Sequence, residues 1–174
     1  MAMTPHRPEQ RGFTLLIAVI FMSVMLAFGL ELASLAYKQQ VLASSAIESQ
    51  YAFYAADAGL ECALYADQQL NSFNYSTHDS NTPPNLITCD NGSATQLSYS
   101  YDSNKLMVAE RLSLDSSTPT PHCAYVTVYK YSTPQSPPKN FTTSIFSQGY
   151  DVSCSVVANP NGARFLSRGI SAYH

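Results

Sequence analysis

The sequence predicts an α+β fold, in which one long N-terminal α-helix packs on an antiparallel β-sheet. Two observations lead to this prediction. Residues 13–70 contain no proline and keep apolar side chains at helical spacing. Beyond Leu70 the chain changes to short alternating segments that are separated by turn residues. The 174 residues provide for one modest domain and an anchor.

The first part of the predicted helix is an uncharged apolar run of eighteen residues, 13–30. As a helix it would be ~27 Å long, about the thickness of the hydrocarbon core of a membrane. Arg7 and Arg11 precede the run, and Glu31 follows it. This excess of basic residues on the N-terminal side predicts that residues 1–12 stay in the cytoplasm and that the rest lies outside.

The helical pattern continues through residues 31–70, where it becomes amphipathic. Gly29, just before this part, costs ~1 kcal/mol relative to alanine inside a helix. Apolar residues recur at spacings of three, four and seven, which places them on one helix face. We expect this face to cover the sheet, with Leu35, Leu42, Ala46, Phe53, Ala56, Leu60 and Leu64 along it.

Residues 71–174 are predicted to form a β-rich domain. A polar loop at 71–84 leads to a short strand at 86–89, and Asn91-Gly92 is the strongest hairpin signal. An antiparallel meander would lay one face on the helix and leave the other in water. Further strands are expected at 97–101, 105–114, 123–131, 141–150, 152–158 and 163–173, with a break near Gly149.

All four cysteines, Cys62, Cys89, Cys123 and Cys154, follow the apolar run. An even number in an exported domain favours two disulfides, with four buried thiols as the alternative. Four cysteines allow three pairings, of which we favour Cys62 with Cys89 and Cys123 with Cys154. Each bridge would close a loop of about thirty residues and stabilise the domain by ~3–4 kcal/mol.

The sequence predicts no catalytic activity, no cofactor and no metal site. Its four histidines are scattered, and it contains none of the common catalytic or phosphate-binding motifs. Asp57, Glu61 and Asp67 could hold a metal ion, although their spacing does not require one. His122 is adjacent to Cys123, but neighbouring residues of a strand point to opposite faces. The net charge is -3, and -4 without residues 1–12, so we expect no direct nucleic-acid binding.

The segment Arg-Gly-Phe-Thr-Leu at residues 11–15, placed directly before the apolar run, resembles the class III signal of the type IV pilin superfamily. The resemblance implies cleavage by a prepilin peptidase between Gly12 and Phe13, and N-methylation of Phe13. It also implies a leader at 1–12, a transmembrane and filament-core helix at 13–30, an amphipathic helix at 31–70 and a β-rich domain at 71–174. The competing interpretations are a secretory signal cut near Ala36 and an uncut signal anchor.

Residues 50–61, QYAFYAADAGLE, look like the segment that ends the long helix in PilX-like minor pilins. Its small residues, Ala52, Ala55, Ala56, Ala58 and Gly59, would let another element approach the backbone closely. Most major pilins carry Glu as the fifth residue after the cut, where it neutralises the terminal amine of a neighbouring subunit. This chain has Ile17 there, as would suit a subunit at the filament tip or one that primes assembly.

The resemblance therefore implies a minor type IV pilin that serves adhesion, twitching motility or DNA uptake. Its partners would be other pilins through the N-terminal helix, the prepilin peptidase and the inner-membrane assembly platform. The precursor would lie in the cytoplasmic membrane and the mature protein in an extracellular pilus. The alternatives are a type II secretion minor pseudopilin and a membrane-anchored exported binding domain that does not polymerise.

Overall fold

The computed structural model describes residues 11–75, 81–89, 92–102, 104–115, 117–119, 121–132 and 141–174. The chain divides into two compact units, residues 1–45 and residues 46–174. This division falls within the predicted amphipathic segment 31–70. Helix α1 (Arg11–Gln68) is continuous through the division and lies within two residues of the helix predicted at 13–70.

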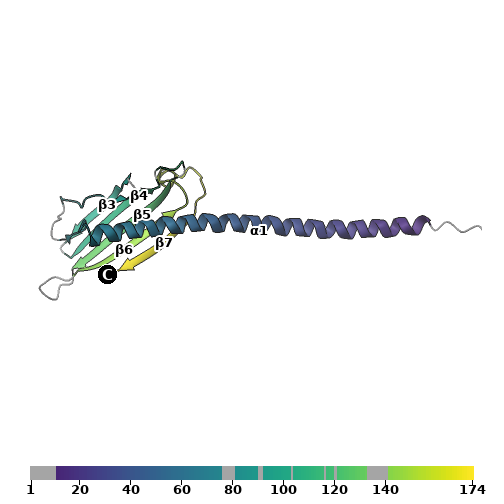
Figure 1. The fold of residues 1–174 in the computed structure, drawn as a ribbon, viewed down its shortest axis with the longest axis horizontal. Helices are drawn as coiled ribbons and strands as arrows, with labels where there is room; N and C mark the ends of the chain where they lie inside the picture. Colours follow the sequence, from purple (N-terminus) through teal and green to yellow (C-terminus); the bar gives the residue numbers. More distant parts are fainter. Residues whose placement is uncertain are drawn as a thin grey trace, which may run out of the picture. The chain divides into compact units, whose positions relative to one another are not determined.

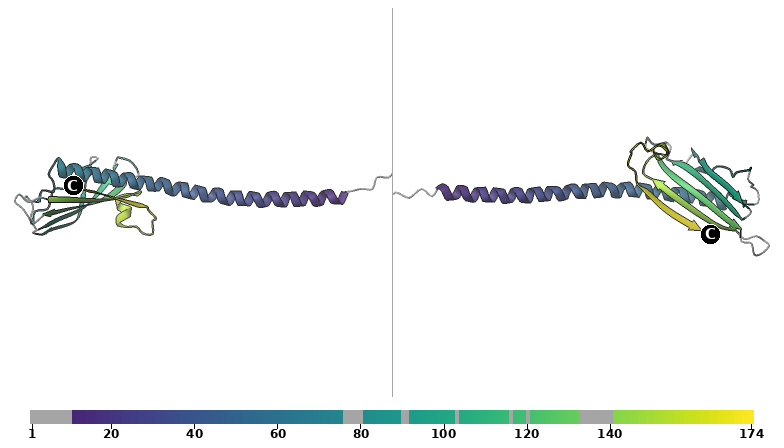
Figure 2. Two further views of the ribbon diagram at one scale, coloured as in Figure 1. Left: turned by 90° about the horizontal axis from the view of Figure 1, so that it is seen from below. Right: turned by 180° about the vertical axis from the view of Figure 1, so that it is seen from behind.

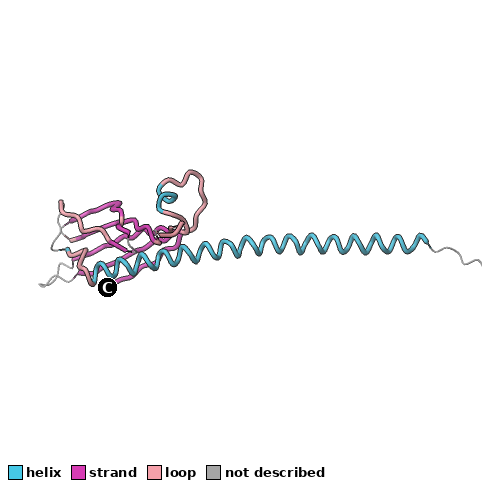
Figure 3. The backbone as a smooth tube through the Cα atoms, turned by 45° about the horizontal axis from the view of Figure 1, so that its top comes forward, coloured by secondary structure: helices cyan, strands magenta, loops and turns pink. Residues whose placement is uncertain are grey.

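The second unit contains a five-stranded antiparallel sheet whose strands follow one another in sequence order (Figure 1). Figure 3 shows the strands of this unit in magenta. A separate two-residue hairpin precedes the sheet. The predicted α+β fold with an antiparallel meander is therefore confirmed. The strands are β1 (Thr88–Cys89) and β2 (Gly92–Ser93) in the hairpin, and β3 (Thr95–Asp102), β4 (Lys105–Leu114), β5 (His122–Ser132), β6 (Phe141–Tyr150) and β7 (Ser167–Tyr173) in the sheet.

Strict alternation of side chains along β4 and β5 gives the sheet one buried face. In β4 every second residue from Leu106 to Leu114 is buried, and in β5 Ala124, Val126 and Val128 are buried. Tyr125 and Tyr129 alternate with them and remain half-exposed on the other face, as the period of a strand requires. The buried face packs on the part of α1 that lies in the second unit (Figure 2).

The face of α1 that meets the sheet differs from the predicted stripe of large apolar residues. Phe53 is 46% exposed, and Leu60 and Leu64 only flank the core. Leu35, Leu42 and Ala46 are exposed as well. The buried face consists of small residues instead, namely Ala52, Ala55, Ala56, Gly59, Ala63 and Ala66, whereas Ala58 is exposed. The small side chains allow the helix backbone to lie close against the strands.

Two glycines mark where helix and sheet approach most closely. A Cβ atom on Gly149 would overlap the backbone of α1 at Ala52 and Ala56. A Cβ atom on Gly59 would lie 2.7 Å from the Ser147 hydroxyl and 2.8 Å from the Ala124 Cβ. The expected strand break near Gly149 falls one residue later, since β6 ends at Tyr150, and Gly149 itself pairs with Ala124 on one side and Arg168 on the other. Because Gly149 has no side chain, the backbone of α1 can lie directly against β6 at this point.

The predicted strand at 152–158 is wrong. Residues Cys154–Ala158 form a short helix, α2, in which the amides of Val156 and Val157 donate to the Ser153 carbonyl. Both edges of β6 already pair, with β5 and β7, so no position beside it is open to this segment. Cys154 is instead bonded to Cys123 on β5. The tertiary structure thus overrides the strand propensity of two consecutive valines.

Two smaller differences concern the strands before β4. The strand expected at 97–101 begins earlier, at Thr95, and its pairing with β4 shifts between Gln96 and Ser98, where Leu97 is 45% exposed. A bulge of this kind leaves the extra residue unpaired. In the hairpin, Gly92 pairs with Cys89, whereas Asn91 lies outside the described residues. The loop expected at 133–139 lies outside them too.

Candidate functional site: the exposed apolar helix and the disulfide-linked unit

The bond expected to be cut joins the second and third residues of α1. Gly12 and Phe13 both have helical backbone, and the Phe13 side chain is 70% exposed. The preceding residues, Arg7 among them, lie outside the described part of the chain. The apolar run therefore begins with a side chain that the described residues leave mostly uncovered.

The apolar run of α1 is exposed along its whole length. Thirteen large apolar side chains between Phe13 and Leu30 are each 46–73% exposed. Its most apolar eighteen-residue window has a mean hydropathy of 2.6 and is 0% buried. Burying one such side chain fully is worth roughly 1.5–3 kcal/mol, so this surface requires a cover of lipid or of other apolar helices. By length and composition the helix can cross a membrane.

Two serine hydroxyl groups, one in the run and one beside it, are hydrogen-bonded within the helix itself. The Ser23 hydroxyl donates to the Ile20 carbonyl at 2.8 Å, and the Ser34 hydroxyl donates to the Glu31 carbonyl at 2.9 Å. Ile17, the fifth residue of the run, is an uncharged side chain that is 50% exposed. The run is therefore uncharged. A carboxylate at this position would cost ~3 kcal/mol inside a membrane, and Ile17 avoids that cost.

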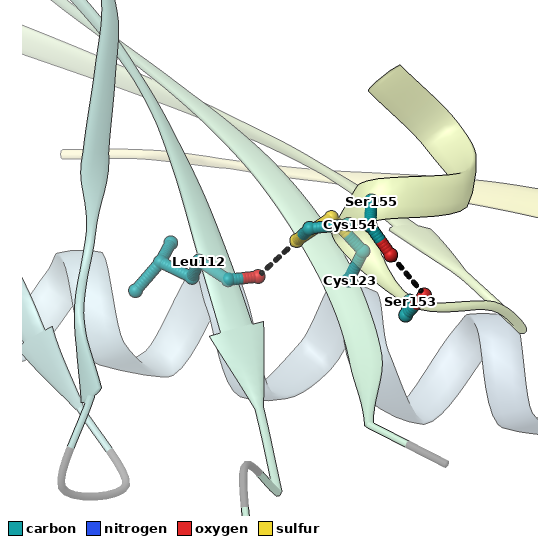
Figure 4. Close-up of a disulfide and its surroundings, with 5 residues drawn as sticks. All are labelled: Leu112, Cys123, Ser153, Cys154 and Ser155. Carbon is teal, nitrogen blue, oxygen red and sulfur yellow. Dashed lines mark hydrogen bonds between the residues drawn. A yellow bond between two sulfur atoms is a disulfide. The ribbon is translucent and has the colours of Figure 1, made fainter. Parts of the chain in front are cut away.

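The four cysteines form two disulfides in the second unit, and none of them is free. Cys62 on α1 is bonded to Cys89 on β1, with a Cα–Cα distance of 6.3 Å. Cys123 on β5 is bonded to Cys154 on α2, with a Cα–Cα distance of 4.8 Å. This is the sequential pairing that the sequence analysis favoured. Figure 4 shows the second bridge, in which the Cys154 sulfur lies 3.1 Å from the Leu112 carbonyl oxygen.

The residues weighed as metal ligands do not come together. Asp67 is buried and forms an ion pair with Lys130 on β5 at 2.5 Å, and its Oδ2 lies within hydrogen-bond distance of the His174 Nε2, at 3.1 Å. It thus ties the end of α1 to the sheet. Asp57 and Glu61 lie on more exposed parts of α1. Within the described residues, no group of three or more His, Cys, Asp or Glu side chains could hold a metal ion.

The suggested pair of His122 and Cys123 is separated by the fold. Cys123 is fully buried in its disulfide, and the His122 ring stacks on Tyr51 of α1 with ring centroids 5.3 Å apart. His174 pairs with Asp67, whereas His6 and His78 lie outside the described residues. The two described histidines therefore take part in contacts that link α1 to the sheet.

One buried carboxyl group, that of Glu110, was not among the residues predicted from the sequence. Its side chain belongs to the buried face of β4 and is 1% exposed. Oε2 accepts a hydrogen bond from the Ile87 amide at 2.9 Å, and Oε1 has no partner among the described residues. Burial raises the pKa of Glu110, and the bond from Ile87 partly opposes that rise. The alternation of β4 with Leu106, Val108 and Leu112 was the signal that could have revealed it.

We expect Glu110 to make the second unit less stable as the pH rises. The folded-state pKa lies above the ordinary value of 4.5, so the folded chain holds this proton more tightly than the unfolded chain. The resulting stabilisation is complete below the unfolded pKa and is lost as the pH rises through the folded pKa. Glu110→Gln keeps an acceptor for the Ile87 amide but cannot ionise, so its stability should not decline over this range.

The measurement is the thermal midpoint of the near-UV circular dichroism of the full chain in detergent, between pH 4 and pH 8. Glu61→Gln, on an exposed part of α1, is the matched control and should keep the wild-type slope. An identical slope in wild type and Glu110→Gln would contradict the assignment.

Comparison of the chain with protein-family models, with curated proteins and with solved structures finds no match. A function for this chain therefore has to be argued from its own residues and geometry.

Proposed function

We propose that this protein is a minor type IV pilin, a non-catalytic filament subunit. The observation that carries the proposal is helix α1, which combines an exposed, uncharged apolar run with a segment that forms the core of an α+β unit. The first part suits a membrane and, after extraction, the packed helices of neighbouring subunits. The second part supports a disulfide-linked unit of the kind found in oxidising compartments.

The junction at Gly12 and Phe13 supports processing by a prepilin peptidase. Cleavage there would remove residues 1–12 and leave the amine of Phe13 at the start of the apolar run, as a substrate for N-methylation. The precursor would lie in the cytoplasmic membrane with the second unit outside. The mature chain would then join other pilins through residues 13–30, on the inner-membrane assembly platform.

Ile17 supports a position at or near the filament tip, or a role in priming assembly. A buried unpaired ammonium costs several kcal/mol, so a subunit that enters the middle of a filament needs a carboxylate near the amine of its neighbour. A subunit at the tip has no further neighbour to neutralise. The same feature fits a type II secretion minor pseudopilin, since the tip pseudopilin also lacks the acid. Sheared surface filaments that contain the protein would favour the pilus.

Co-expression with an active prepilin peptidase should shorten the chain by residues 1–12, because the Gly-Phe bond directly precedes the apolar helix. Intact mass and N-terminal sequencing should give a chain that begins at N-methylated Phe13. Gly12→Val should block the cut, whereas Gly29→Ala, deeper in the same helix, should be processed like wild type. Retention of residues 1–12, or a cut near Ala36, would leave a signal anchor or a secreted domain instead.

The proposed position is tested on filaments by immunogold labelling of the second unit. We expect gold particles at filament ends, and Ile17→Glu should allow the subunit to appear along the shaft. Even labelling along wild-type filaments would exclude the tip assignment while leaving the pilin assignment intact.

A further inference from the structure

The face of the sheet that turns away from α1 carries a polar cavity beneath α2. Arg111 and Ser113 of β4 alternate with the buried Leu112 and therefore point to this face. Thr95 of the edge strand β3 is paired directly with Arg111. The disulfide from Cys123 to Cys154 holds α2 over the same face, opposite α1 (Figures 2 and 4).

The cavity has a volume of about 320 Å³. Pockets for small molecules typically measure ~300–1,000 Å³, so this one has room for a single ring rather than a chain of rings. Its polar lining comes from three elements of the second unit, with the disulfide and Ala158 supplying an apolar wall. The polar residues are Thr95, Arg111, Ser113, Ser155 and Asn159.

Arg111 makes the cavity selective for negative charge. Its side chain is half-buried, and within the described ranges its guanidinium has no ion pair and no hydrogen bond. Among the described residues, the lining contains no carboxylate. A partly desolvated cation without a partner is costly, and guanidinium binds carboxylate and phosphate through two parallel hydrogen bonds. The charge of the cavity therefore calls for an oxyanion.

The remaining polar groups of the cavity can form hydrogen bonds with hydroxyl groups on the same ligand. Ser113 and Thr95 each offer a hydroxyl group that donates and accepts, and Asn159 offers an amide that does the same. The Ser155 hydroxyl is hydrogen-bonded to the Ser153 hydroxyl at 2.9 Å, and this bond fixes its orientation at the edge of the cavity (Figure 4). A bare anion would use Arg111 and leave the other groups without partners.

We propose that this cavity binds one acidic sugar unit, that is, an oxyanion carried by a hydroxylated ring. The oxyanion lies against Arg111, the ring hydroxyls meet Thr95, Ser113 and Asn159, and the ring carbons face Ala158 and the disulfide. A carboxylate on a uronic or sialic acid and a phosphate on a sugar share this chemistry. The site lies wholly within the second unit and is independent of the filament proposal.

Saturation-transfer NMR on the full chain in detergent micelles tests the proposal with four probes. These are glucuronic acid, N-acetylneuraminic acid, glucose 6-phosphate and, as the neutral control, glucose. We expect at least one acidic sugar to bind about tenfold or more tightly than glucose, since one charge-assisted contact accounts for such a factor. The preferred acid distinguishes a carboxylate-bearing from a phosphate-bearing source.

Arg111→Ala should weaken that binding about tenfold or more, and Arg111→Lys should restore only part of it, because lysine lacks the planar fork. Lys105→Ala is the matched control. Lys105 belongs to the same face of the same strand, but its ammonium lies 4.8 Å from the centre of the Tyr129 ring, outside the cavity. Near-UV circular dichroism should show that all three variants fold.

Three results would overturn the proposal. Equal binding of the acidic sugars and glucose would show that the charge of Arg111 is not used. Arg111→Ala and Lys105→Ala could weaken binding equally, which would indicate non-specific attraction. Inorganic phosphate or acetate alone could bind as tightly as the acidic sugars, which would remove the role assigned to the ring.

Discussion

Gly149→Ala is expected to destabilise the second unit by about 3 kcal/mol, the upper end of the usual cost of overpacking. The added Cβ would overlap the backbone of α1 at Ala52 and Ala56, and a backbone cannot move aside as the end of a side chain can. The helix and the sheet would have to separate along the face that holds the small residues. For a unit of this size we expect the thermal midpoint to fall by about 10 °C.

The measurement is the loss of near-UV circular dichroism from the tyrosines of the full chain in detergent, because the chain contains no tryptophan. Gly169→Ala is the matched control in the neighbouring strand. Its Cβ would lie 2.9 Å from the tip of the Phe146 ring, which is 43% exposed and free to turn. A loss below ~1 kcal/mol is expected there. Equal losses in the two variants would show that the close approach at Gly149 does not limit stability.

Removing the disulfide between Cys123 and Cys154 should have the second large effect. The two residues are 31 positions apart, and opening a loop of this length costs ~3–4 kcal/mol in the chain-entropy account. Alanine at both positions avoids placing a polar group at the fully buried position 123. Without the bridge, α2 has only five residues and few contacts of its own, so a local loss of order should accompany the global one.

Two measurements separate these effects. The thermal midpoint reports the whole unit, and hydrogen exchange of the peptide that covers α2 reports the local change. The double variant Cys62→Ala with Cys89→Ala removes a bridge of similar loop length, 27 positions, which joins α1 to β1 and does not involve α2. It should lower the midpoint while leaving exchange in α2 near the wild-type rate. Unchanged exchange in α2 after loss of the Cys123–Cys154 bridge would contradict the role given to it.

The local sequence pattern was sufficient to predict the positions of the long elements of this fold. The helix ends within two residues of its expected limit, because no proline interrupts it and the composition changes at Leu70. Strands β4 and β5 lie within one residue of the segments predicted at 105–114 and 123–131, and for β5 the alternation of Ala124, Val126 and Val128 with larger polar side chains was the signal. In each case the local preference and the tertiary environment agree.

The sequence predictions were wrong where contacts with another element of the fold determine the local structure. Residues 152–158 have strand propensity, but β6 has no open edge for them and a disulfide holds them elsewhere. Phe53 has the right spacing for a core residue, yet the core admits only small side chains at that distance from the sheet. Spacing along one helix carries no information on how near the partner lies.

The candidate sites divide in the same way. The Gly12–Phe13 junction, the uncharged run and Ile17 are contiguous features, so the sequence by itself determined them, together with the fold class. Only the tertiary structure decided which cysteines pair, which face of α1 is buried, that Glu110 is enclosed and that Arg111 opens into a cavity. The physical reason is that these properties arise from residues far apart in the chain, whose distances are set by packing rather than by sequence separation.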